Sequence, residues 1–233
     1  MIGIIGAMDV EIELLKSDLD LEKKSERAQM VFYQGKLKGK EVVLVKSGIG
    51  KVNAAVCTQI LVDDFSVDKV IFTGVAGAVD KKLDVGDIVI STDTIQHDVN
   101  STVMGYELGE IAEMNKAKFI ADQTLISLAK DAGEKLIEEG ATIKVVTGRV
   151  LSGDQFIADD EKVEWLKETF GGYCAEMEGA AVGQACFLND LPFVIIRSMS
   201  DKADGSADVD YSTFMEKAAN RSYRIVEEML DHI

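Results

Sequence analysis

The chain has 233 residues, 47% of them hydrophobic, so we expect one sizeable core and a single domain over residues 1–233. Its 41 acidic and 25 basic residues give a net charge of -16, which opposes binding to nucleic acid and to anionic membrane surfaces. No apolar run approaches the roughly 20 residues of a membrane span and no signal peptide opens the chain, so the sequence predicts a cytoplasmic protein.

Short apolar runs rich in β-branched residues alternate with segments of helical periodicity. Buried strands are expected over residues 2–5, 42–45, 70–73, 88–90, 143–146 and 193–196. Helices are expected over residues 10–19, 53–62 and 124–136, and a long C-terminal helix is expected from Tyr211 with Asp210 as its N-cap. This alternation predicts an α/β domain with a mixed, mostly parallel central sheet flanked by helices.

Cysteine and histidine usage argues against a metal site. Cys57, Cys174 and Cys186 are odd in number and lie in apolar or Ala-rich segments, which is typical of reduced, packed thiols. The two histidines, His97 and His232, are far apart in the sequence. We therefore expect no metal, and we interpret His97 with the following Asp98 as a structural pair.

Ligands of such α/β folds bind at the carboxyl ends of strands, which directs attention to the junctions over residues 6–11, 47–50, 73–77 and 197–201. Gly48-Ile-Gly50 begins like a dinucleotide fingerprint, but Asn53 stands where the third glycine belongs. The same segment lacks the upstream glycine and the Ser/Thr of a phosphate-binding P-loop. No nucleotide cofactor is expected.

Carboxylates are the remaining candidates for chemistry. Glu11 follows the first predicted strand, Asp201 ends the most apolar one, and Glu176-Met-Glu178 precedes an Ala-rich helical segment. Each also has a structural interpretation. Asp201 could cap a helix, Glu11 could lie on a solvated face, and the Glu176 pair could interact with a helix macrodipole.

Several motifs together resemble the bacterial 5'-methylthioadenosine/S-adenosylhomocysteine nucleosidases of the purine nucleoside phosphorylase superfamily. They are Glu176-Met-Glu178, Ile196-Arg-Ser-Met-Ser-Asp201, the segments 150–157 and 2–8, and the shorter segments 46–52 and 105–109. The match runs nearly end to end in the same order. The resemblance implies a nucleoside phosphorylase-like homodimer without cofactors. It further implies hydrolysis of 5'-substituted adenosines, among them 5'-methylthioadenosine, S-adenosylhomocysteine and 5'-deoxyadenosine, to adenine and the free 5'-substituted ribose.

The resemblance also implies roles for individual residues. Asp201 matches the general acid that protonates N7 of adenine, and Glu11 matches the general base that activates water. Glu178 matches the carboxylate that binds the ribose hydroxyls, and Arg197 the arginine near the water and the acidic groups. The implied substrate-binding residues are Ile49, Gly77, Phe156, Ile157, Glu176, Met177, Glu178 and Ser200, together with Tyr106 and Met104 from the partner subunit's loop.

These residue types suit the chemistry. Adenine leaves readily only when protonated, and bond cleavage produces an oxocarbenium-like sugar, so the site needs an acid, an anion and positioned water. Burial after an apolar strand would raise the pKa of Asp201, whereas Arg197 would help Glu11 to stay ionised.

The chain departs from the family pattern at three positions near the sugar and the 5' group. Val75 replaces a serine that many relatives carry, Met104 stands where phenylalanine is common, and Ala112 where proline is common. The reaction is therefore better determined than the substrate.

Two alternatives remain open. A purine nucleoside phosphorylase would need a basic anion cradle, which the junction around Glu11 does not offer. A non-catalytic nucleoside-binding protein of the same fold would be the natural interpretation if Glu11 or Asp201 had been replaced, and both are present.

Overall fold

The structure is a computed structural model that describes residues 1–201 and 207–233, without the side chains of residues 207–213. Its strands are β1 (Ile2–Gly6), β2 (Asp20–Arg27), β3 (Met30–Leu37), β4 (Lys40–Lys46), β5 (Lys69–Ala78), β6 (Ile88–Gln96), β7 (Phe119–Ile120), β8 (Val145–Ser152), β9 (Cys174–Glu176) and β10 (Phe193–Asp201). Its helices are α1 (Asp9–Asp18), α2 (Lys51–Phe65), η1 (Thr102–Met104), α3 (Gln123–Glu138), α4 (Asp160–Phe170), α5 (Gly179–Leu188) and α6 (Ala207–His232).

The strands form one mixed sheet with β1, β5 and β10 at its centre. Strand β1 pairs in parallel with β4 and β5, and β5 pairs in parallel with β10. Strand β10 also pairs antiparallel with β6, which continues through β8 and β9 back to β5, so these five strands close into a ring. The predicted fold class is confirmed. Among the strands predicted from the sequence, only β6 with β10 is an antiparallel pair.

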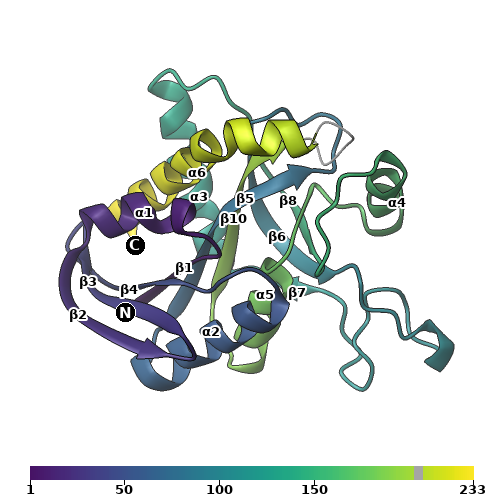
Figure 1. Cartoon of the computed structure of the whole chain (residues 1–233), viewed down its shortest axis with the longest axis horizontal. Helices are drawn as coiled ribbons and strands as arrows, with labels where there is room; N and C mark the ends of the chain where they lie inside the picture. Colours follow the sequence, from purple (N-terminus) through teal and green to yellow (C-terminus); the bar gives the residue numbers. More distant parts are fainter. Residues whose placement is uncertain (202–206) are drawn as a thin grey trace.

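Helices cover the sheet from two sides. Helices α1, α3 and α6 lie over one face and α2 and α5 over the other, while α4 stands apart near β8 (Figure 1). Strands β1 and β10 between them are fully buried, as their apolar runs predict, because both faces are covered. Among the described residues, no helix combines the length and the apolar character needed to cross a membrane.

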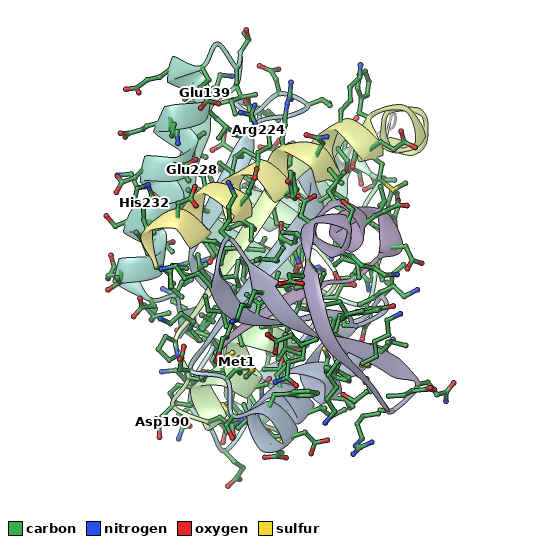
Figure 2. All side chains as sticks on the ribbon, turned by 90° about the vertical axis from the view of Figure 1, so that its left-hand side faces the viewer. Met1, Glu139, Asp190, Arg224, Glu228 and His232 are labelled. Carbon is green, nitrogen blue, oxygen red and sulfur yellow. The ribbon has the colours of Figure 1, made fainter. Side chains whose placement is uncertain are left out.

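Helix α6 is the longest helix of the described chain and lies alongside α3 (Figure 2). Arg224 of α6 pairs with Glu139, and Lys135 of α3 pairs with Glu228, across 2.5 and 2.6 Å respectively. Such exposed pairs contribute at most about 1 kcal/mol, so the buried face of α6 supplies most of the packing energy. That face includes Ile225, Val226, Met229 and Leu230.

The sequence mispredicted the start of helix α6 and did not predict strand β2. Helix α6 begins at Ala207, so Asp210 lies inside the helix and is not its N-cap. The side chains of Asp210 and Tyr211 lie outside the described residues. The charged segment from Glu22 to Arg27, for which the sequence predicted no strand, is part of strand β2 and pairs with β3. Strand β2 is almost wholly exposed, so it carries no apolar alternation that could reveal it.

Candidate active site

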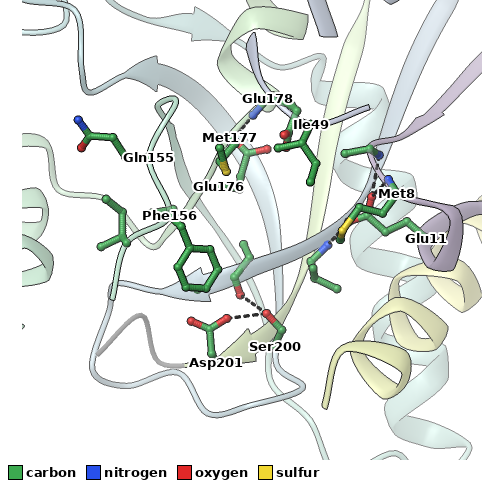
Figure 3. Close-up of a pocket in the computed structure, with 16 residues that line it drawn as sticks. Met8, Glu11, Ile49, Gln155, Phe156, Glu176, Met177, Glu178, Ser200 and Asp201 are labelled. Atoms are coloured by element: carbon green, nitrogen blue, oxygen red, sulfur yellow. Dashed lines mark hydrogen bonds between the residues drawn. The ribbon is translucent and has the colours of Figure 1, made fainter. Parts of the chain in front are cut away.

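The four junctions singled out in the sequence contribute to the walls of one cavity (Figure 3). Ten of the predicted site residues line it: Glu11, Ile49, Gly77, Phe156, Ile157, Glu176, Met177, Glu178, Ser200 and Asp201. They come from the first turn of α1, from the ends of β5, β9 and β10, and from the segments after β4, β8 and β9.

Glu11 is turned back from the first turn of α1 into the cavity. Its Oε2 accepts hydrogen bonds from the backbone N–H groups of Ala7 (2.6 Å) and Met8 (2.9 Å), and its Oε1 accepts one from Val75 (3.0 Å). The carboxylate passes so close to β5 that a Cβ at Gly74 would lie 2.3 Å from Oε1. A side chain at position 74 would therefore displace Glu11.

The pKa of Glu11 is higher than expected from its proximity to Arg197. Burial, which leaves the residue 4% exposed, raises its pKa above the ordinary value of 4.5. Arg197 lowers the pKa as predicted, as do the three backbone N–H donors, but these effects are smaller than that of burial. A base whose pKa is moved toward neutrality accepts a proton more readily, so this shift favours general-base chemistry.

Asp201 ends the buried strand β10 and is 2% exposed. The register of β10 against β5 shifts between Met199 and Asp201, which is the signature of a β-bulge. As a result the consecutive residues Ser200 and Asp201 both line the cavity, and the Ser200 hydroxyl donates to Asp201 Oδ1 over 2.6 Å. Ser200 thus orients Asp201, as the sequence predicts.

Glu176 of the cavity wall forms a buried ion pair with Arg197, which lies behind it. Arg197, 1% exposed, donates from Nε (3.2 Å) and Nη2 (2.5 Å) to Glu176 Oε2. The same carboxylate accepts the Ser152 hydroxyl and the backbone N–H of Gly179 at the start of α5. Although burial opposes its charge, the negative charges of Glu176 and its neighbours raise the pKa of Arg197, so the guanidinium stays charged.

Glu178 precedes α5 and points into the cavity. Its Oε1 accepts the backbone N–H of Gly50 over 2.7 Å, although 128 residues separate the two in the sequence. Burial, together with the negative charge of Glu176, raises the pKa of Glu178 to about 8, against the opposing effects of Gly50 and Arg197. This carboxyl is therefore partly protonated near neutral pH.

Replacing Glu178 with glutamine should stabilise the protein, and more so at high pH. Between its unfolded value of 4.5 and about 8, the folded protein holds a proton on Glu178 that the unfolded chain has released, so stability falls as pH rises through this window. We expect the gain in Tm for Glu178→Gln to be small at pH 5 and to reach at least about 2–4 °C at pH 9. Calorimetry at both pH values measures it. Glu41→Gln, at an exposed carboxyl, serves as the control. A gain for Glu178→Gln that is independent of pH would contradict the assignment.

The cavity has two chemically distinct ends (Figure 3). At one end the ring of Phe156 lies beside Ser200 and Asp201. At the other end Glu11 lies near Met8 and Ile49, with Glu178 on the wall beside them. An aromatic ring with an acid at one end, and carboxylates at the other, suits a planar base joined to a polyhydroxyl sugar.

Comparison with known proteins identifies the family. The family profile described as the phosphorylase superfamily matches residues 1–231. The chain belongs to this superfamily. A 5'-methylthioadenosine/S-adenosylhomocysteine nucleosidase of Staphylococcus saprophyticus is 43% identical over 236 residues, and the match covers 100% of both chains.

Solved structures of superfamily members agree with this assignment. The 5'-methylthioadenosine/S-adenosylhomocysteine nucleosidase of Neisseria meningitidis, in complex with methylthio-immucillin-A, superimposes with a TM-score of 0.94 and 41% identity, covering 100% of this chain and 99% of that one. A futalosine hydrolase of Helicobacter pylori gives a TM-score of 0.91 and 34% identity, covering 100% and 97%. The predicted nucleosidase resemblance is confirmed.

Three of the site residues that the family resemblance predicts do not line the cavity. Arg197 lies behind it and acts through Glu176. Met104 is 63% exposed at the end of η1, and the hydroxyl of Tyr106 accepts the backbone N–H of Glu113 within the same loop. Neither loop residue lines the cavity of its own chain.

The sequence missed other residues of the wall. Met8 lines the cavity and also packs against the hydrophobic core. Its position in the junction after β1 was the signal that could have identified it. The remaining wall residues absent from the predicted site are Ala7, Val75, Ala76, Gln155 and Ala175. Val75 was noted only as a departure from the pattern; its backbone binds Glu11 and its side chain packs with Ala218 and Ala219 of α6.

The His97–Asp98 interpretation was also wrong in detail. Neither ring nitrogen of the buried His97 has a hydrogen-bond partner among the described residues. Burial lowers the pKa of His97, which keeps the imidazole neutral. Asp98 instead pairs with Lys51.

Proposed function

We propose that this chain is a nucleosidase that hydrolyses the N-glycosidic bond of 5'-substituted adenosines, giving adenine and the free 5'-substituted ribose. The observation that carries the proposal is that two buried carboxyls from opposite ends of the sequence, Asp201 and Glu11, line one cavity. The relatives' names and their nucleoside-analogue complex support the same reaction class.

In the proposed mechanism adenine stacks on Phe156 and Asp201 donates its proton to N7. The bond between C1' and N9 then breaks, the electron pair leaves with adenine, and the sugar acquires oxocarbenium character. Glu178 accepts hydrogen bonds from the ribose hydroxyls, and its ionised form opposes the developing positive charge. Glu11 removes a proton from a water molecule as the water oxygen bonds to C1'.

Charge favours water over phosphate as the nucleophile. Of the described residues that line the cavity, four are acidic and none is lysine or arginine; the acidic ones are Glu11, Glu176, Glu178 and Asp201. The nearby cation, Arg197, is already paired with Glu176. A phosphate ion would meet several carboxylates without a free basic partner, whereas water needs only one carboxylate as its base.

The wall near Glu11 favours an apolar 5' group. Met8 and Ile49 contribute hydrophobic surface there (Figure 3), as does Val75, whose N–H binds Glu11. This supports 5'-methylthioadenosine and S-adenosylhomocysteine, whose 5' carbon bears a thioether, and also accommodates 5'-deoxyadenosine. The likeness to a futalosine hydrolase adds an aminofutalosine-like nucleoside to the compounds to be compared.

One assay separates this function from its alternatives. The purified protein is incubated with 5'-methylthioadenosine in ¹⁸O-water, with and without phosphate, and the products are identified by mass spectrometry. We expect adenine and a free sugar carrying ¹⁸O at C1, at a rate independent of phosphate. A sugar 1-phosphate would establish the phosphorylase, and binding without adenine release from any 5'-substituted adenosine would establish the non-catalytic nucleoside-binding protein.

We also infer a homodimer in which the partner's loop closes each cavity. Exposed apolar residues on α2, including Val52 at 73% exposure, lie next to Ile49 at the cavity wall. The loop that carries Met104 and Tyr106 does not line the cavity of its own chain, and it exposes further apolar surface. Activity per active site should fall at dilutions where sedimentation detects monomers. A fully active monomer would refute the closed-loop arrangement.

The proposal also includes a cytoplasmic location and a single-domain chain. The three cysteines are free and buried, which fits the reducing cytoplasm predicted from the sequence. The family profile spans nearly the whole chain, which supports a single nucleosidase domain over residues 1–233.

A further inference from the structure

Asp98 links two segments that border the cavity. It follows β6 by two residues, and its carboxylate accepts Lys51 Nζ at Oδ1 (2.6 Å) and the backbone N–H of Asp154 at Oδ2 (3.0 Å). The Asp154 side chain in turn accepts the backbone N–H of Lys51 (2.9 Å). Three residues thus form a closed set of hydrogen bonds between the start of α2 and the segment after β8.

Both linked segments carry cavity groups. The residue before Lys51 is Gly50, whose N–H donates to Glu178. Gly50 has a left-handed φ of +99°, so its orientation depends on a backbone conformation that other residues rarely adopt. Phe156 follows Asp154 by two residues and forms part of the cavity wall. The linkage therefore fixes the ribose-side and base-side segments relative to each other.

The linkage is only partly shielded from water, which limits its contribution to stability. The side chains of Lys51 and Asp98 are each 18% exposed. Although burial tends to raise the pKa of Asp98, its bonds to Lys51 and Asp154 lower it below the ordinary value, so the carboxylate is ionised at neutral pH. Ion pairs at such positions stabilise folded proteins only modestly. A specific effect on the cavity can thus be separated from an effect on folding.

We propose that Asp98 is a positioning residue of the nucleosidase site: through Lys51 and Asp154 it holds the Gly50 N–H against Glu178, and ribose recognition depends on it. This inference rests on the proposed function. It assigns Asp98 no contact with substrate. Loss of its carboxylate should release the start of α2 and weaken the placement of Glu178 for the ribose hydroxyls.

The test compares two substrates that differ in one ribose hydroxyl, 5'-methylthioadenosine and its 3'-deoxy counterpart. Asp98→Ala should lower kcat/KM for the ribonucleoside at least about tenfold more than for the deoxy compound, because only the former uses the hydroxyl interaction in full. Lys51→Met should produce the same selective loss in weaker form, and Lys51→Arg, which keeps the charge and the donor, should restore the wild-type selectivity.

Asp80→Ala is the matched control. Asp80 also accepts a lysine ammonium group, that of Lys167 (2.8 Å), and one backbone N–H, that of Lys82 (3.0 Å), but it does not line the cavity. We expect no change in selectivity in this variant.

Equal losses on both substrates, or no loss, in Asp98→Ala would overturn the inference. If Asp98→Ala does not fold, Lys51→Met decides by the same criterion. Wild-type protein that releases no adenine would instead overturn the proposed function, so the two failures are distinguishable.

Discussion

Asp201→Asn should lower adenine release from 5'-methylthioadenosine by about 10³-fold, within the 10²–10⁴ range of general acid catalysis. Asparagine has nearly the volume of aspartate and its carbonyl oxygen still accepts the Ser200 hydroxyl, so the end of β10 should keep its structure. The amide has no transferable proton for N7. Steady-state kinetics and near-UV circular dichroism measure the two effects.

A substrate with an activated leaving group tests the role of that proton. The 4-nitrophenolate of a 4-nitrophenyl riboside departs without protonation at a purine nitrogen, so Asp201→Asn should retain most of the wild-type rate with this substrate. Equal losses with both substrates would show that Asp201 has a structural role. Asp80→Asn, which alters a bonded carboxylate outside the cavity, should leave both rates unchanged.

Glu11→Gln should lower turnover by about 10²–10⁴-fold because the amide cannot accept a proton from water. The amide oxygen can still accept the N–H groups of Ala7 and Met8, but the amide nitrogen would face the N–H of Val75. We therefore expect a small local adjustment, which a comparison of melting temperatures reports separately from the kinetics.

The chemical nature of the Glu11 defect can be tested with azide. Azide attacks carbon without losing a proton, so it should restore bond cleavage in Glu11→Gln and yield the glycosyl azide. It should not restore Asp201→Asn with an adenine leaving group. Recovery in both variants, or in neither, would contradict the separate roles of base and acid.

The central strands could be predicted from the sequence because burial on both faces leaves continuous apolar runs, as in β1 and β10. The ends of these strands were predicted less accurately. Strand β5 continues to Ala78, beyond the apolar run, through a glycine-containing segment that is held by pairing with β10 and β9. Strand β2 was not predicted because it is exposed and therefore lacks an apolar pattern. Its pairing with β3 places it in the sheet.

The candidate site was predicted mainly through family motifs, and its internal contacts were not. The bond between Gly50 and Glu178 joins residues 128 positions apart, and the pair of Arg197 with Glu176 depends on β9 and β10 reaching the same buried region. The pKa of Glu11 was expected to remain low because Arg197 is near; the extent of burial, which no local pattern encodes, reverses that balance.

A crystal structure with a bound, unreactive analogue of 5'-methylthioadenosine tests the central claim most directly. We predict that the Asp201 carboxyl lies about 2.6–3.2 Å from N7 of the base, and that a water molecule bonded to Glu11 approaches C1' from the opposite side. A bound analogue whose glycosidic bond lies out of reach of both carboxyls, or with Glu11 and Asp201 on the same side of the sugar, would contradict the mechanism.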